Sequence, residues 1–310
     1  VLDNFEHLIS ERSLTFLLKV LDRASGIKFL ITSRVHLQLH GEQRYWLQGL
    51  PFSISQATLS VEAAATGYSS HRLFLAAVGR VSPTYRLTAT DVPALLAICQ
   101  QVQGMPLALE LAAAWSNVLS LAEIAAEIGR NLDFLAHEAH DLPVRQRSMR
   151  AVFATSWRLL NATEQSVLQK VAIFRGGFTR EAAHTVAGAA LPVLSSLVRK
   201  SFLHKCGSER FEIHELLRQF AQEQLVMAGE LHAVQRAHTT YFLALAEQAQ
   251  PHFFSTARQI WIQRLESEHD NLRAALTWAL RYQETESLVR LAFALRLLWE
   301  CRHYYDEMNE

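Results

Sequence analysis

The sequence is short of cysteine, of long apolar runs and of net charge, and each shortage excludes a class of protein. Its cysteines, Cys99, Cys206 and Cys301, are odd in number and far apart, so neither a disulfide framework nor a zinc cluster is indicated. No apolar run reaches the roughly 18 residues of a membrane span. These absences favour a protein of the reducing cytoplasm without a membrane partner.

The charges of the chain cancel. Lys and Arg together number 30, as do Asp and Glu, so no overall field attracts nucleic acid or an anionic membrane. Half of the 310 residues are hydrophobic and 19% are charged, which is typical of folded chains and allows two or three domains. The chain starts inside a predicted strand without an initiator methionine. We therefore expect a part of a longer protein, and the lack of a leader segment says little.

Two apolar runs near the N-terminus end in polar residues. The first run ends at Asp3, and the second, residues 27–31, is followed shortly by Arg34. Neither run alternates with polar residues, so both predict fully buried parallel strands joined by a helix with leucines at helical spacing. Because ligands in such sheets lie beyond the carboxyl ends of the strands, we expect Asp3 and Arg34 to project into one crevice.

The chemistry of this pair suits phosphate. A carboxylate at a strand end supplies the hard oxygen that Mg²⁺ prefers, and a cation on the neighbouring strand can sense a terminal phosphate. The same two residues are also compatible with ordinary polar strand ends. The pattern alone leaves both interpretations open.

Apart from a short strand predicted around 45–47, the rest of the chain is mainly helical, and the expected fold class is mainly α and multidomain. Helices are predicted over 72–81, 91–103, 106–117 and 121–129, with Pro106 at a helix start because its missing N–H needs no partner there. Helices over 149–160, 163–173, 179–187 and 193–200 precede two strands, 202–205 and 211–213, in the layout of a winged helix. Further helices over 234–248, 260–282 and 286–304 indicate the start of an α-solenoid.

Seven segments form a pattern through their order and spacing. They are Val1–His7, Ile31–Arg34, Gly104–Ala114, Phe174–Thr179, Leu197–Ser201, Ile213–Ala221 and Glu266–Leu276. Together they resemble the STAND class of signalling ATPases, most closely the NB-ARC-like ATPase cores of bacterial transcriptional regulators with LuxR-type or SARP-type DNA-binding domains. In that resemblance the first segment is the Walker B region, the second is sensor 1 and the third is the GLPLAL-type motif.

The resemblance implies four domains. They are the C-terminal part of a P-loop α/β nucleotide-binding domain at 1–66, a helical domain at 67–142, a winged-helix domain at 143–228 and the first TPR-like repeats of a solenoid at 229–310. It also implies a switch that is closed around ADP and opened by exchange for ATP. A protein or small-molecule inducer is expected at the TPR-like region, DNA only through an output domain outside this chain, and a nucleotide-dependent homo-oligomer as a further partner.

The resemblance also implies roles for four residues. Asp3 would hold Mg²⁺ through water and Arg34 would read the γ-phosphate of ATP, so these two form the expected catalytic pair. Pro106 would pack beside the adenine. His214 would reach the β-phosphate of ADP and lock the winged helix onto the nucleotide, which gives ADP the differential affinity that a switch needs.

The chain departs from the family pattern at several places. It contains no Gly-x-x-x-x-Gly-Lys-Ser/Thr, so the Walker A phosphate cradle is missing and the chain by itself should bind nucleotide poorly. Asn4 stands where many relatives carry a second acid, and since an amide cannot accept a proton, slow turnover is expected. Glu6 could orient water instead, but a solvated acid at a helix start is the preferred interpretation. Glu215 replaces the usual aspartate after His214 and keeps the charge.

A second class of function stays open, namely a non-enzymatic helical adaptor with a vestigial nucleotide crevice.

Three other sequence signals are weak. The run His137-Glu138-Ala139-His140 is one residue short of the zinc-protease spacing. Gly176-Gly177 is followed by no lysine and predicts a tight turn. The third winged-helix helix offers only Arg199 and Lys200 as cations, which predicts packing within the chain rather than contact with DNA.

Overall fold

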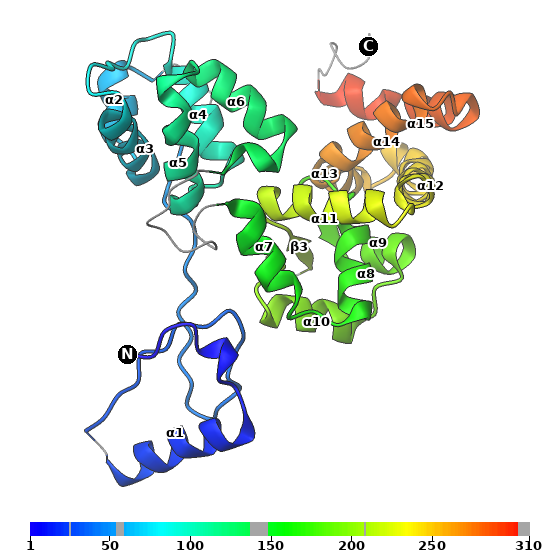
Figure 1. Cartoon of the computed structure of the whole chain (residues 1–310). Helices are drawn as coiled ribbons and strands as arrows, with labels where there is room; N and C mark the ends of the chain where they lie inside the picture. The colour runs from blue at the N-terminus through cyan, green and yellow to red at the C-terminus, as the bar shows by residue number, and fades with distance from the viewer. Residues whose placement is uncertain (25, 54–58, 137–147, 208, 303–310) are drawn as a thin grey trace.

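The computed structural model describes residues 1–24, 26–53, 59–136, 148–207 and 209–302. It is mainly helical, which confirms the predicted class. Figure 1 shows an N-terminal segment with α1 (Glu11–Arg23), a helical block, a central block with a small sheet, and a group of C-terminal helices. The domain boundaries given above stay predictions.

The N-terminal segment, residues 1–53, contains one parallel bridge in place of two strands. Leu2 pairs with Ile31: the Leu2 N–H donates to the Leu30 carbonyl, and the Thr32 N–H donates to the Leu2 carbonyl, both at 2.9 Å. The prediction of fully buried strands is wrong, because Leu30 is 66% exposed.

The buried hydrophobic residues described in the N-terminal segment are Phe5, in the 3-10 turn η1 (Phe5–His7), and Leu17 in α1, too few to cover both faces of the pair. The strand predicted around 45–47 is also absent from the segment, where Tyr45 and Leu47 are exposed.

The helical block contains α2 (Val61–Thr66), α3 (Ser69–Val81), α4 (Val92–Gln101), α5 (Pro106–Ala113), η2 (Ala114–Asn117), α6 (Leu121–Arg130) and η3 (Leu132–Phe134). In its core α3 packs on α5 and α4 packs on α6, around fully buried leucines and isoleucines. α5 begins at Pro106, as predicted. α6 begins with a capping box in which Ser120 and Glu123 satisfy each other's backbone N–H groups.

Two glycines let the end of the N-terminal segment lie against the turn before α5. The Leu50 N–H donates to the Gly104 carbonyl at 2.8 Å. A Cβ on Gly49 would lie 2.0 Å from the Gln103 carbonyl oxygen, and a Cβ on Gly104 would lie 2.0 Å from that of Leu50. Gly104 also has φ +65°, a conformation that favours glycine. This close approach fixes the segment beside the residues that precede Pro106.

The central block contains α7 (Met149–Trp157), α8 (Ala162–Val171), β1 (Phe178–Thr179), α9 (Arg180–Ala187), α10 (Leu191–Arg199), β2 (His204–Cys206), β3 (Arg210–Glu212) and α11 (Glu215–Met227). The strands form an antiparallel sheet in the order β1-β3-β2, with Phe211 opposite both Phe178 and Lys205. The predicted hairpin is therefore confirmed. β1 was not predicted, because two residues carry no periodic signal.

The C-terminal helices are α12 (Leu231–Ala249), η5 (Gln250–Phe254), α13 (Arg258–Ser267), α14 (His269–Arg281) and α15 (Thr285–Arg302), with α12 packed on α14 and α15. The prediction of one helix over 260–282 is wrong, because α13 ends and α14 starts around Glu268, which has φ −106° and ψ 10°. The Glu268 carboxylate is held there by the side chains of Arg210 and Asn271. These tertiary contacts override a continuous helical pattern.

Within the described ranges, no single helix is long and apolar enough to cross a membrane. α9 and α10 pass that test of length and composition only as a pair, and they are bent by 110° at their break. Both helices bury residues in the core of the central block, among them Ala183 and Leu197.

The contact between Gly104 and Leu50 predicts a position-specific loss of stability. Gly104→Ala should lower the free energy of unfolding by about 3 kcal/mol, because it combines a left-handed φ with a clash against backbone. Gly188→Ala is the matched control, since Gly188 has φ +64° but nothing within 4 Å of the added methyl, and it should cost about 1 kcal/mol. Urea denaturation followed by circular dichroism measures both. Equal losses would contradict the close approach.

Candidate functional site

Asp3 lies at the end of the Leu2–Ile31 pair and is exposed. Its Oδ1 accepts a hydrogen bond from the Thr32 hydroxyl, and its Oδ2 accepts a long one, 3.5 Å, from the Asn4 side chain. Oδ2 thus keeps room for a water of a metal ion, as the predicted Mg²⁺ role requires. The contacts described for Asp3 do not include Arg34, so a shared crevice stays a prediction.

Arg34 ties the N-terminal segment to the central block. Its Nη1 donates to the hydroxyl of Ser156 on α7, and its carbonyl accepts from the Ser201 hydroxyl at 3.1 Å. Glu6 holds Arg34 from within the segment: its Oε1 lies 3.8 Å from Arg34 Nε, and its Oε2 accepts from the Arg34 backbone N–H at 3.4 Å. The Glu6 side chain is only 3% exposed, so the interpretation of Glu6 as a solvated acid is wrong. The Arg34 side chain is 37% exposed.

His214 stands at the N-terminus of α11, and its two ring nitrogens differ in their contacts. Its Nδ1 accepts from the Leu216 N–H at 3.2 Å, which places the ring proton on Nε2. Nε2 is buried and makes no hydrogen bond of good geometry, although the Val102 backbone carbonyl lies within reach of the ring as an acceptor. Burial, and next the neighbouring His204, lower the pKa of His214 to about 4, so the ring is neutral at pH 7. A buried N–H donor at the start of a helix is suited to an anion.

Two neighbours connect His214 to other parts of the chain. The Val102 carbonyl, in the turn before Pro106, lies within hydrogen-bonding reach of the His214 ring and opposes the lowering of the His214 pKa. His204 on β2 lies edge-on to Trp46 of the N-terminal segment, with ring centroids 5.0 Å apart. Arg34 reaches the same block through Ser156 and Ser201. The structure therefore places the turn before Pro106 beside His214, while the N-terminal segment contacts the same block at His204, Ser156 and Ser201.

Sequence reasoning missed the residues that make these connections. Ser201 belongs to the segment Leu197–Ser201, and Trp46 and His204 fall in predicted strands, but no pattern indicated these connections. The role of each, like that of Ser156, follows only from long-range contacts. Pro106 itself is exposed at the first turn of α5. It could pack against a planar ligand, and its predicted role in holding adenine stays a prediction.

The residues present fit a bound phosphate and magnesium in part. His214 offers a buried donor without a hydrogen bond of good geometry, and Asp3 an exposed carboxylate. Searched over the part of the chain that the structure describes, no group of three His, Cys, Asp or Glu side chains could hold a metal ion. The run from His137 to His140 lies outside the described residues, so its weak zinc signal is not tested.

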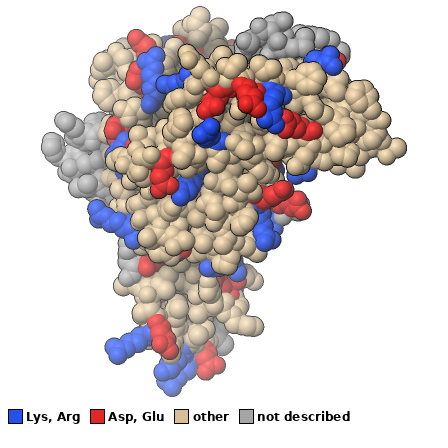
Figure 2. Space-filling view, turned by 90° about the vertical axis from the view of Figure 1, so that its right-hand side faces the viewer, with Lys and Arg blue, Asp and Glu red and all other residues tan. Residues whose placement is uncertain are grey.

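The cations of α10 contact protein groups. Lys200 Nζ donates to Glu164 Oε2 at 2.7 Å and to the Leu159 carbonyl at 2.9 Å, and the Glu164 side chain is 5% exposed. Arg199 Nη1 donates to the Ser195 hydroxyl at 3.1 Å. Figure 2 shows acidic and basic side chains interspersed on one face of the molecule. These contacts agree with packing of α10 within the chain rather than contact with a nucleic-acid backbone.

A groove of about 640 Å³ lies between α9 and α12. Its polar lining comes from Thr185, His232, Arg236, Thr240 and Tyr241. None of the four predicted site residues lines it. The groove belongs in part to the region where an inducer was expected, and that expectation stays a prediction.

No family model matches the chain. "Putative HTH-type transcriptional regulator Rv0890c" of Mycobacterium tuberculosis is 30% identical over 317 residues, which cover 99% of this chain and 34% of that protein. "Putative HTH-type transcriptional regulator Mb0914c" of Mycobacterium bovis has the same values. "Uncharacterized protein Rv0894" of Mycobacterium tuberculosis is 27% identical over 245 residues, 76% of this chain and 58% of that protein. The chain thus spans about a third of the length of the first of these relatives.

A solved structure gives a weaker likeness. It is a Signal Transduction ATPase with Numerous Domains, or STAND protein, with a tetratricopeptide repeat sensor from Pyrococcus horikoshii. The match covers 97% of this chain and 47% of that one, with 16% identity and a TM-score of 0.30. A similarity at this level carries no argument about fold or function.

The buried neutral ring of His214 predicts a pH dependence of stability. Its folded pKa of about 4 lies below the ordinary 6.5, so the unfolded chain binds more protons as pH falls from 6.5 towards 4, and stability is lost in that window. His238, whose pKa burial also lowers to about 4, acts in the same direction. Between pH 7 and pH 5, His214→Gln should lose about 1 to 2 kcal/mol less than the unchanged chain.

Urea denaturation at several pH values measures this difference. His232→Gln is the control, because His232 is exposed, and it should leave the pH dependence as it is. An identical pH slope for His214→Gln and the unchanged chain would show that His214 is not buried neutral.

Proposed function

We propose that this chain is the switch portion of a nucleotide-gated STAND-type signalling ATPase that regulates transcription through an output domain outside the chain. The regulatory part of the proposal is supported by relatives named as HTH-type transcriptional regulators, which match along nearly the whole chain. The nucleotide part is supported by one observation above all: the buried Nε2 of His214 at the start of α11 makes no hydrogen bond of good geometry and has only the Val102 carbonyl named as an acceptor near it.

Each residue of the proposed site has a task that its contacts permit. His214 Nε2–H donates to the β-phosphate of ADP, aided by the N-terminus of α11. Asp3 holds Mg²⁺ through water, and Arg34, whose side chain is partly exposed, reads the γ-phosphate of ATP. Pro106 packs beside the adenine. ADP bound between His214 and the N-terminal segment would stabilise the closed arrangement of the central block.

Slow turnover follows from the residues near Asp3. Asn4 is an amide that donates to Asp3, so it cannot act as a general base. Glu6, the other candidate, has both carboxylate oxygens directed at Arg34. Hydrolysis, where it occurs, is therefore slow, as suits a switch. A nucleotide-dependent homo-oligomer and an inducer at the C-terminal helices belong to the same proposal.

The second candidate function is a non-enzymatic helical adaptor. It is favoured by one specific observation: Arg34 is already bound to Ser156 and Glu6, so the protein itself occupies much of the side chain that should read phosphate. In this alternative the groove between α9 and α12 receives a partner and the nucleotide crevice is vestigial.

Nucleotide retention by the complete gene product separates the two functions. The product is purified, denatured, and the released nucleotide is identified by chromatography. We expect close to one ADP per chain, and a loss of about tenfold or more in His214→Gln, because a charge-assisted hydrogen bond is removed.

His71→Gln is the matched control. His71 is also buried, with Nδ1 at 3.0 Å from the Ala64 carbonyl oxygen and Nε2 unpaired, but it lies in the helical block on α3. It should keep ADP. A folded gene product without nucleotide would overturn the switch and leave the adaptor.

A further inference from the structure

The contact between the central block and the C-terminal helices is centred on Asn271, in the first turn of α14. Asn271 is fully buried. Its Oδ1 accepts from the Arg175 backbone N–H at 2.7 Å and lies 3.4 Å from His238 Nε2 of α12. Its Nδ2 donates to the Gly177 carbonyl at 2.9 Å and to Glu268 Oε2 at 2.8 Å. One side chain thus binds the turn before β1 from the helical side.

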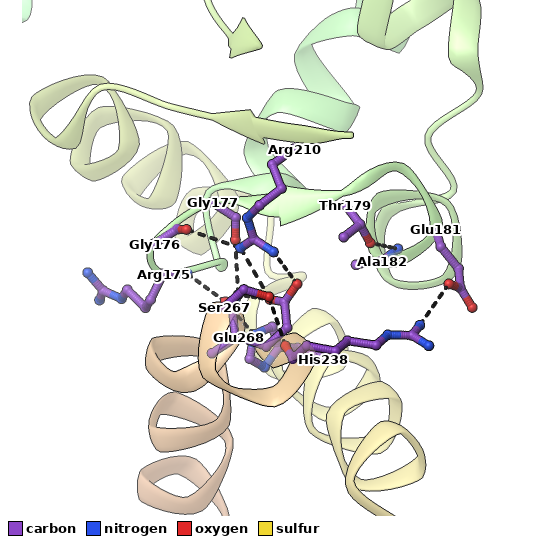
Figure 3. A network of polar contacts seen from close by, with 12 residues as sticks. Arg175, Gly176, Gly177, Thr179, Glu181, Ala182, Arg210, His238, Ser267 and Glu268 are labelled. Atoms are coloured by element: carbon purple, nitrogen blue, oxygen red, sulfur yellow. Dashed lines mark hydrogen bonds and ion pairs between the residues drawn. The ribbon is translucent and has the colours of Figure 1, made fainter. Parts of the chain in front are cut away.

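Arg210 of β3 binds the same turn from the sheet side. Its guanidinium pairs with Glu268, and its Nη2 also donates to the Gly176 carbonyl at 3.1 Å (Figure 3). Gly176 and Gly177 have φ +65° and +85°, and a Cβ on Gly177 would lie 2.9 Å from the Phe211 carbonyl oxygen. The turn fits only because it has no side chains. We call the set of Arg175, Gly176, Gly177, Arg210, His238, Glu268 and Asn271 the Asn271 joint.

Buried rings surround the joint on its inner side. Phe174 stacks on Phe178, with centroids 4.9 Å apart, and lies 5.3 Å from the ring of His238. Polar groups that are paired inside an apolar surround are costly to separate, so the joint behaves as a rigid connection. A displacement of the α13–α14 junction should therefore also move the backbone of Arg175, which donates a hydrogen bond to Asn271.

The side chain of Arg175 leads from the joint to α11. Its Nη1 lies 3.9 Å from Glu215 Oε1. Glu215 also accepts two hydrogen bonds of 2.7 Å from Arg218, which is itself bound to the Ala172 carbonyl at 3.2 Å. Glu215 directly follows His214 at the start of α11. Only Arg175 and Glu215 separate Asn271 from His214.

We propose that Arg175 is a positioning residue that transmits the position of the C-terminal helices to His214. Asn271 holds its backbone, and its guanidinium forms an ion pair of 3.9 Å with Glu215, so a shift of α13 and α14 alters the first turn of α11. The inference names a regulatory input for the site described under Proposed function and rests on that function for its meaning. The contact path itself is independent of nucleotide.

The test measures backbone amide exchange and ring titration in the 310-residue chain by NMR, with no nucleotide added. Arg175→Gln should speed exchange of the Leu216 and Arg218 amides, both of which donate to His214, by about threefold or more. It should also shift the midpoint of the His214 ring titration. Arg175→Lys keeps the charge and should restore both readouts in part.

Arg264→Gln is the matched control. Arg264 joins the same two parts of the molecule through Glu181, at 3.4 Å, but on the exposed rim and away from α11. It should change neither readout. Asn271→Ala should give the same two changes as Arg175→Gln, because it removes the hydrogen bond to the backbone N–H of Arg175.

The outcomes separate the joint from the proposed function. Faster exchange confined to residues 174–178 in Arg175→Gln, with α11 and the His214 titration unchanged, would overturn the inference. So would equal effects of Arg264→Gln and Arg175→Gln. Coupling seen here together with a complete gene product that retains no ADP would uphold the joint and reject the nucleotide switch.

Discussion

A polar group that leaves water must find a partner inside the protein, and this requirement shapes the contact between the central block and the C-terminal helices. The amide of Asn271 has donors and acceptors to satisfy, and it does so with the backbone of a Gly-Gly turn and with Glu268. To reach those partners, Glu268 leaves helical geometry and the turn adopts left-handed conformations. The break between α13 and α14 and the course of the chain into β1 follow from one buried side chain.

The junction at the other end of the molecule is built differently. The N-terminal segment meets the central block through Arg34, Ser156, Ser201 and the edge of Trp46 on His204. Small polar interfaces of this kind permit relative motion of the parts they connect, whereas large apolar ones resist it. The chain therefore combines one firmly packed connection with one polar one, and His214 lies between them, in contact with the turn before Pro106.

Much of the fold could be predicted from the sequence. The spacing of apolar residues indicates where helices lie, and residues such as proline and glycine indicate where they begin and end. Pro106 at the start of α5 and the β2–β3 hairpin are examples. The failures share one cause. The break at Glu268, the burial of Glu6 and the contacts of Trp46 all depend on residues far away in the chain, which no local pattern reports. The predicted strands at Leu2 and Ile31 were expected to be buried on the strength of their apolar composition, but composition cannot supply the layer that would cover them.

Asp3, Arg34, Pro106 and His214 were predicted as site residues from their positions in the motifs. The structure then showed which groups they contact. The structure adds most for His214, since it shows that Nδ1 accepts from Leu216 while Nε2 makes no hydrogen bond of good geometry. Arg34 loses some of its apparent freedom, because its carbonyl and guanidinium are both engaged. Residues with one unsatisfied group are more informative about ligands than residues that are merely conspicuous in a motif.

The single bridge between Leu2 and Ile31 has a practical consequence for handling the chain. A two-membered pair exposes unpaired main-chain groups along its edges, and Val1 and Leu30, next to the paired residues in the chain, are exposed apolar side chains. Exposed edges of this kind recruit further strands from other molecules. Concentration-dependent self-association and early proteolytic cleavage should therefore begin within the first 50 or so residues, and protein prepared at high concentration is best monitored there.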